Sequence, residues 1–427
     1  MPAPMYECGI DAEPLNQYRP GGYHPLVLGE ALNGGRYKII HKLGWGSYST
    51  TWAAKDQKCP VPATNNVPSP LLTFARNDRY VAVKVRISET QEAGELKILR
   101  ALSPFTADHL GSTYVNRMLD HFTLVGPNGS HNCLVLEIVG PNVADFVDSH
   151  FKDGRLPPEL AKAFAKQMLQ GVDFLAANNI GHGGEACRTT QSIIMLTLLT
   201  DLHARNLALV VPDLDSLSEE DFVAKLGQPE TRPVIRSDGG PLGNDVPAEM
   251  VYPAFFQKRD LLKSSSIKII DFGEAFLSND PPSTLHTPLP VRAPEVIFMD
   301  RLDRRVDLWS AGCLIFELIA EHPPFDAIMA TPPTTVKQMI ALASDKLPPR
   351  WQAQWNAMQK DMSSLHDYGD ETVLQSLEDA YFFDPSKNVE LTRDELVMVA
   401  DAIALLLKLE PSLRASPSDV LAAGWFR

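Results

Sequence analysis

Residues Asp201 to Asn206 have the types and spacing needed for phosphoryl transfer. They read Asp-Leu-His-Ala-Arg-Asn. An aspartate at the start of such a loop can orient an incoming hydroxyl and accept its proton, and the asparagine oxygen can bind Mg²⁺. The pair His182-Gly183, which should come directly before Asp201, is separated from it by the 17 residues 184–200. The sequence therefore predicts a catalytic loop that is interrupted by an insertion.

A second group of residues could bind a metal ion and phosphates. Ile267–Ile270 reads as a strand that leads into Asp271-Phe-Gly, and a carboxylate at a strand end suits Mg²⁺, which prefers hard oxygen ligands. Lys84, in Val-Ala-Val-Lys, lies within an apolar strand, although it could also extend to solvent from an edge strand. A lysine in such a strand needs a phosphate or a carboxylate as its partner. Glu95, in the next predicted helix, is the candidate carboxylate.

A glycine-containing turn precedes Lys84. The stretch 43–51, Leu-Gly-Trp-Gly-Ser-Tyr-Ser-Thr-Thr, lies between two predicted strands. Gly44 and Gly46 would let the backbone approach a triphosphate closely, which a Cβ would block. Ser49 stands where a third glycine is expected. Taken alone, this motif favours a plain hairpin turn over a phosphate site.

Two charged residues downstream could stabilise the catalytic region. Asp307, in Arg-Val-Asp-Leu-Trp-Ser-Ala-Gly, fits a buried aspartate that holds the backbone of the catalytic loop. Arg414 could pair with Glu295, which ends Ala-Pro-Glu. Both could also be ordinary helix-capping or surface charges. Their order and context favour the specific roles.

In this order, the motifs resemble the eukaryotic protein kinase fold, and the resemblance covers about residues 37–427. Four stretches look similar to the SR-protein kinase family, especially to its divergent members in filamentous fungi: Tyr23–Gly29, Lys42–Trp52, Leu134–Gly140 and Val291–Val296. The Gly-Trp-Gly-x-x-Ser-Thr form of the turn carries this resemblance. Ser49 is then a trait of the family.

The resemblance implies transfer of the γ-phosphate of ATP, with Mg²⁺, to serine or threonine of Arg/Ser-rich proteins such as splicing factors, in the cytoplasm and nucleus. The catalytic residues it implies are Asp201, Lys84, Glu95, Asn206 and His203. The implied nucleotide-binding residues are Leu43, Gly44, Trp45, Gly46, Ser47, Ser49, Thr51, Ala82, Lys84, Leu136, Glu137 and Val139. The implied metal ligands are Asn206 and Asp271.

The elements that must position these residues change character near residue 140. Strands are predicted at 37–43, 50–55, 79–85 and 131–139, with a loop at 57–78, and helices at 89–102, 159–175, 306–320, 393–409 and 417–425. The predicted fold class is α+β and bilobal, with a small β-rich N-lobe (37–139) and a larger helical C-lobe (140–427). Residues 1–36 are expected to be an extended lead-in, and 207–266 an inserted surface excursion.

Composition excludes several classes of function. The chain has 427 residues, 44% of them hydrophobic, which is typical of a globular protein. Its five cysteines form no C-x-x-C pair, which argues against a disulfide framework or a zinc site. No apolar run has the length of a membrane span, and the N-terminus does not read as a signal peptide. The net charge of −14 disfavours direct nucleic-acid binding and suits a basic protein partner; a monomer is expected.

Departures from the kinase pattern leave alternatives open. Gly183 stands where most protein kinases have an arginine that interacts with the phosphorylated activation loop. We therefore expect that phosphorylation does not switch the activity. His203 replaces a lysine that helps neutralise the γ-phosphate, and His-Gly-Asp-Leu-His also resembles the loop of small-molecule kinases. We hypothesise that 184–200 is a translated intron. If the insertion is genuine, the chain is expected to be a poor kinase or a pseudokinase that acts as a scaffold.

Overall fold

The computed structural model describes residues 5–57, 79–89, 94–103, 109–183, 203–262, 265–325, 330–361 and 371–427. The predicted loop at 57–78, apart from its first residue, and the insertion 184–200 lie outside these residues, as does Asp201. The chain divides into two compact units. Unit 1 comprises residues 1–92, 117–140 and 211–264, and unit 2 comprises residues 93–116, 141–210 and 265–427.

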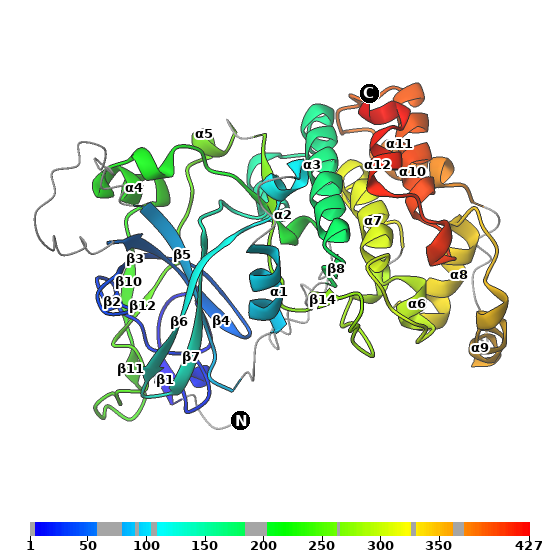
Figure 1. Ribbon diagram of the computed structural model, residues 1–427. Coiled ribbons are helices and arrows are strands. Elements are labelled where there is room, and N and C mark those ends of the chain that lie inside the picture. Colours follow the sequence, from blue (N-terminus) through cyan, green and yellow to red (C-terminus); the bar gives the residue numbers. More distant parts are fainter. Residues whose placement is uncertain are drawn as a thin grey trace, which may run out of the picture. The chain divides into compact units, whose positions relative to one another are not determined.

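Unit 1 is built on a six-stranded antiparallel sheet with the strand order β2-β3-β4-β5-β7-β6 (Figure 1). Its strands are β2 (Ala31–Leu32), β3 (Tyr37–Gly46), β4 (Ser49–Asp56), β5 (Arg79–Arg86), β6 (Met118–Gly126) and β7 (Gly129–Glu137). Alternate side chains point to opposite faces of a strand. Those of one face, including Trp52, Val83 and Val135, form a buried core. The strand predictions are confirmed, with each strand a few residues longer or shifted at its ends.

Residues 211–264 pack within unit 1, although the sequence analysis placed them in the larger lobe as a surface excursion. The reason is a set of contacts with the sheet that no local pattern reveals. Phe222 stacks on Tyr80 with the ring centroids 3.8 Å apart, and Glu219 pairs with Lys38 at 2.8 Å. The elements of this segment are α4 (Glu219–Leu226), β10 (Thr231–Pro233), β11 (Ile235–Arg236), β12 (Glu249–Val251) and α5 (Lys258–Leu261).

The N-terminal segment is also more than an extended lead-in. Strand β1 (Tyr6–Glu7) pairs with β11. Tyr18 and Tyr23 are buried in a second cluster, against Val234, Val246 and Met250 of the 211–264 segment. Residues 5–29 and 211–264 are therefore structural parts of unit 1.

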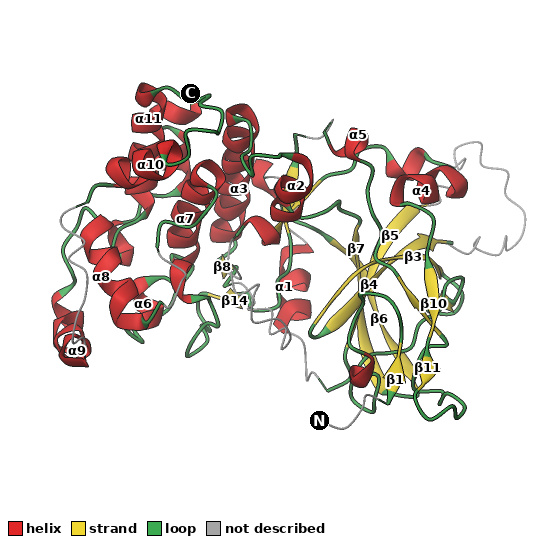
Figure 2. Ribbon diagram, turned by 180° about the vertical axis from the view of Figure 1, so that it is seen from behind, coloured by secondary structure: helices red, strands yellow, loops and turns green. Residues whose placement is uncertain are grey.

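Unit 2 is mainly helical, as Figure 2 shows in red. Its helices are α1 (Gly94–Leu102), α2 (Val143–His150), α3 (Pro158–Ala177), α6 (Pro294–Ile297), α7 (Val306–Ala320), α8 (Pro332–Leu342), α9 (Gln352–Met358), α10 (Val373–Phe382), α11 (Arg393–Leu406) and α12 (Pro417–Leu421). Its short strands pair as β8 (Ile180–Gly181) with β14 (Phe276–Leu277) and β9 (Leu207–Leu209) with β13 (Ile267–Ile269).

Helix α7 lies at the core of unit 2 because nearly every one of its side chains is apolar and buried. It packs against α3 and α11. The prediction of a helix at 306–320 is confirmed at both ends. The helix predicted at 417–425 was too long, since α12 ends at Leu421 and a short 3₁₀ turn follows at Gly424–Phe426. Among the described residues, no helix is long and apolar enough to span a membrane.

Candidate active site

Strands β3 and β4 form the glycine-containing hairpin predicted to bind phosphates. Gly46 pairs with Ser49 and Gly44 with Thr51, so Ser47 and Tyr48 make the two-residue turn. A Cβ at Gly44 or Gly46 would meet no protein atom within 4 Å. The space beside both glycines is therefore open to a ligand. Ser49 has no positive φ and is buried, which explains why this position does not require glycine.

The register of the sheet brings the other nucleotide-binding candidates of unit 1 close to this hairpin. Lys84 lies opposite Thr51 on β4 and opposite Leu134 on β7. Ala82 lies opposite Leu136. Ala82 and Lys84 are two residues apart on β5, so their side chains point to the same face of the sheet.

The candidates Leu136, Glu137 and Val139 lie at the end of β7 or just after it. The Glu137 carboxylate accepts hydrogen bonds from the Arg117 guanidinium at 3.0 and 2.6 Å, and the Glu137 backbone N–H donates to the Arg117 carbonyl oxygen at 3.2 Å. Val139 follows the end of the strand. Any contribution of Glu137 to nucleotide binding must therefore come from its main-chain carbonyl group.

Glu95, unlike the hairpin residues, lies in unit 2. Glu95 is in the first turn of α1 and is only 2% exposed. A carboxylate this deeply buried needs a partner. Leu43, Trp45 and Ser47 belong to unit 1 with the rest of the hairpin.

Asp307 holds the backbone that leads into the catalytic loop. Its carboxylate accepts hydrogen bonds from the N–H groups of His182, at 2.7 Å, and Gly183, at 3.2 Å. Asp307 is 1% exposed; burial raises its pKa, while the charge of His182 and these two hydrogen bonds oppose the rise. The sequence prediction of a bracing aspartate matches this geometry.

Gly183 occupies a position where no side chain fits. Its φ is +68°, in the left-handed region that favours glycine. A Cβ there would come within 2.6 Å of the Glu274 carbonyl oxygen. The arginine that most protein kinases carry here is excluded by both the backbone conformation and this contact.

His203 is neutral and serves as a cap. Its Nδ1 accepts hydrogen bonds from the N–H groups of Arg205, at 2.7 Å, and Asn206, at 3.1 Å. Burial lowers its pKa to about 3, with a further contribution from the positive charge of Arg205. His203 therefore cannot supply the positive charge of the lysine it replaces. It fixes the turn that carries Asn206 instead.

Asn206 and Asp271 are brought to the same end of the β9–β13 pair. Ile269 pairs with Leu207, and the Ile270 N–H donates to the Asn206 carbonyl oxygen at 2.9 Å. Asp271 follows directly, with φ +62°. A non-glycine residue in the left-handed region is uncommon, and such residues often mark functional sites. The two side chains fit Mg²⁺, which needs oxygen donors.

Glu295 and Arg414 form a buried ion pair. Both guanidinium NH₂ groups lie 2.6 Å from the Glu295 carboxylate oxygens. The side chains are 2% and 0% exposed. Arg414 also donates to the Arg305 carbonyl oxygen at 2.7 Å, which links the pair to the start of α7. The predicted pairing is thus present in the described structure.

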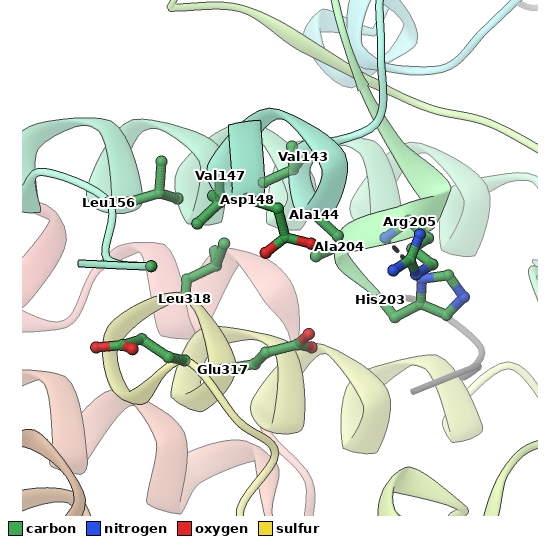
Figure 3. A pocket seen from close by; sticks show the side chains of 12 residues that line it. Val143, Ala144, Val147, Asp148, Leu156, His203, Ala204, Arg205, Glu317 and Leu318 are labelled. Carbon is green, nitrogen blue, oxygen red and sulfur yellow. Dashed lines mark hydrogen bonds between the residues drawn. The ribbon is translucent and has the colours of Figure 1, made fainter. Parts of the chain in front are cut away.

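A pocket of about 100 Å³ opens beside the catalytic loop (Figure 3). It is lined by His203, Ala204 and Arg205 of the loop together with residues from α2, α7 and the turns that follow them. Asp148, Glu317 and Glu321 contribute three carboxylates. Glu321 already pairs with Arg155 at 3.0 Å, and Arg205 pairs with Asp145 at 2.8 Å.

Glu317 is the unusual member of this pocket. Among the described residues, none donates a hydrogen bond to its carboxylate. Burial raises its pKa to about 7, against a smaller opposing effect of the Arg205 charge. Sequence reasoning missed it, although a lone glutamate inside the apolar run of α7 was the available signal.

Comparisons with known proteins find similarity to protein kinases. The protein kinase domain family matches residues 259–426. A serine/threonine protein kinase of Aspergillus fumigatus is 26% identical over 74% of this chain and 66% of its own length. The serine/threonine-protein kinase SRPK of Physarum polycephalum is 29% identical over 72% of this chain and 65% of its own. The chain thus spans slightly less than two thirds of these relatives.

A shorter match reaches higher identity. The kinase sky1 of Dictyostelium discoideum is 34% identical over 38% of this chain and 27% of its own length. A crystal structure of a kinase domain superimposes with a TM-score of 0.60 at 19% identity, covering 95% of this chain. These findings confirm the protein kinase fold and the resemblance to the SR-protein kinases. Such domains in general use ATP and Mg²⁺.

Proposed function

We propose that this chain, which carries a protein kinase domain, transfers the γ-phosphate of ATP to serine or threonine hydroxyls of protein substrates. The observation that carries the proposal is the arrangement in unit 2, where Asp307 holds the loop backbone while Asn206 and Asp271 meet at one sheet end. The buried pair of Glu295 and Arg414 adds a feature that small-molecule kinases generally lack.

In this proposal, each residue has one task. Asp201 accepts the proton of the attacking hydroxyl, and Asn206 and Asp271 hold Mg²⁺, which neutralises charge that develops on the phosphates. Lys84 binds the α- and β-phosphates. The hairpin 43–51 covers the phosphates, while Ala82, Leu136 and Val139 surround the adenine.

The substrate is proposed to be basic and Arg/Ser-rich. Asp148 and Glu317 line the pocket beside the catalytic loop, and the described residues leave the Glu317 carboxylate without a hydrogen-bond donor. A planar guanidinium carries the donors that carboxylates bind best. The net charge of −14 is consistent with a cationic partner. We further propose a monomer that acts in the cytoplasm and nucleus.

The second candidate is a pseudokinase that acts as a scaffold. It is favoured by one observation, the 17 residues 184–200 between Gly183 and Asp201. Displacement of a catalytic group by about 1 Å can lower the rate about 100-fold. An inserted segment directly before Asp201 could have this effect.

A transfer assay distinguishes these functions. Radiolabelled ATP and an Arg-Ser peptide are incubated with the full chain and with a variant that lacks 184–200. We expect transfer by the deleted variant, and its loss in Asp271→Asn versions of both proteins. Transfer by the deleted form alone would assign the fault to the insertion. Silence from both forms would overturn the kinase proposal and leave the scaffold.

A further inference from the structure

The N-terminal segment reaches the tip of the phosphate hairpin. The Tyr23 hydroxyl donates a hydrogen bond to the Gly46 carbonyl oxygen at 2.8 Å. The tyrosine is 2% exposed, so its ring is fixed by packing. Gly46 is the last residue of β3 and one of the two glycines that leave space for a ligand. Tyr23 therefore holds the part of the hairpin whose position matters for phosphates.

The N-terminal segment also contacts the base of the hairpin. Lys42, directly before the glycine-containing stretch, is fully buried and forms an ion pair with Glu13. The Tyr18 hydroxyl donates to the same carboxylate. A buried lysine without a partner is strongly destabilising. Glu13 supplies that partner. The segment 13–23 therefore contacts β3 at two places, at Lys42 just before the stretch 43–46 and at Gly46 at its end.

The segment is itself held in place, so it cannot simply follow the hairpin. The Asn128 side-chain amide donates to the Tyr23 carbonyl oxygen at 2.6 Å and to the Asp245 carbonyl oxygen at 2.7 Å. The ring of Tyr23 lies 5.6 Å from that of Tyr18. Both tyrosines pack into the cluster formed with the 211–264 segment. The hydroxyl of Tyr23 is thus presented from a rigid support.

We propose that Tyr23 is a positioning residue for the nucleotide phosphates, acting through the Gly46 carbonyl. The proposal rests on the ATP binding proposed above. A hairpin tip with two glycines and a two-residue turn has little side-chain packing of its own. Fixing it before ATP arrives removes part of the ordering cost of binding. The 211–264 segment then serves as the support that keeps Tyr23 in place.

The control for this role is a second tyrosine in the same unit. The Tyr80 hydroxyl also donates to a backbone carbonyl oxygen, that of Leu217, at 3.2 Å. Tyr80 is likewise buried, at 4% exposure, but its bond lies away from the hairpin. Tyr23→Phe and Tyr80→Phe therefore delete the same group and the same kind of hydrogen bond.

The experiment measures the binding of ATP and of adenosine to the full chain by calorimetry. Tyr23→Phe is expected to weaken ATP binding about three- to tenfold, the range for one buried hydrogen bond. Adenosine, which has no phosphates, should bind with unchanged affinity. Tyr80→Phe should leave both affinities unchanged. Hydrogen exchange of residues 43–51 should be faster in Tyr23→Phe alone.

Other outcomes overturn the proposal. Unchanged ATP affinity in Tyr23→Phe, or an equal loss for ATP and adenosine, would show that the hydroxyl does not position the phosphate hairpin. So would an equal loss in Tyr80→Phe, or failure of Tyr23→Phe to fold, because the hydroxyl would then be a general structural anchor. If the unmodified chain binds neither probe, the ATP-binding proposal fails first, and with it this one.

Discussion

The two ends of α7 hold carboxylates in opposite ways. At its start, Asp307 accepts two backbone hydrogen bonds, and nearby Arg414 and Glu295 satisfy each other. Ten residues further on, the Glu317 carboxylate receives no hydrogen bond from the described residues, and burial raises its pKa to about 7. Both ends belong to one helix in one unit.

The difference separates structural charge from charge that is available for recognition. A satisfied buried carboxylate fixes its surroundings, and its removal disturbs them. A half-buried carboxylate without a protein donor can instead pair with a cation that enters the pocket. We infer that Asp307, at the start of α7, holds the catalytic loop in place, and that Glu317, near its end, binds a cationic group of the substrate.

The largest effect on stability is expected at Arg414. Arg414→Leu leaves Glu295 buried without a partner, which should lower the free energy of unfolding by about 3–5 kcal/mol. The control is Arg19→Leu, because Arg19 pairs with Glu89 at 2.7 Å but has a side chain that is 48% exposed. That loss should be about 1 kcal/mol or less. Urea unfolding of both variants tests the contrast, and equal losses would contradict it.

The next effect concerns the rate. Asp307→Asn replaces a carboxylate oxygen by an amide that cannot accept from both His182 and Gly183. The loop should shift, and kcat should fall about 100-fold, with little change in the affinity for ATP. Steady-state kinetics measures kcat, with the full chain or, if only that form transfers phosphate, with the variant that lacks 184–200. Asp303→Asn, a more exposed aspartate at the same helix end, should change kcat less than about twofold; a comparable fall would refute the role of Asp307.

A smaller effect is a pH dependence of substrate binding. The pKa of Glu317 is raised to about 7, so its carboxyl group is mostly neutral at pH 6 and mostly charged at pH 8. The KM for an arginine peptide should therefore fall about three- to tenfold as pH rises between these values. His203 remains neutral throughout, since its pKa is about 3. In Glu317→Gln the profile should be flat; parallel profiles would exclude Glu317.

Most of the local elements and several pairings could be predicted from the sequence. Helix α7 and the strands of the main sheet have strong periodic patterns, and the pairs made by Asp307 and Arg414 follow from ordered motifs. Each of these depends on local residue types or on a motif with a known partner.

The contacts that were missed are those between distant segments without a motif. Glu13 and Lys42 form a buried ion pair, yet neither residue belongs to a sequence motif from which the other could be predicted. The same holds for Phe222 on Tyr80, which brings 211–264 into unit 1. The neutral state of His203 also depends on its surroundings in the fold, since burial sets its pKa. The boundaries at 36 and 139 stay a prediction.

The most direct test compares an Arg-Ser peptide with the same peptide containing citrulline, the uncharged analogue of arginine. The value of kcat/KM is measured for both peptides with the active form and with its Glu317→Gln variant. We predict at least about a tenfold preference for arginine, the scale of a charge-assisted bidentate contact, and a preference close to one in the variant. The same preference in both proteins, or no transfer to either peptide, would contradict the account.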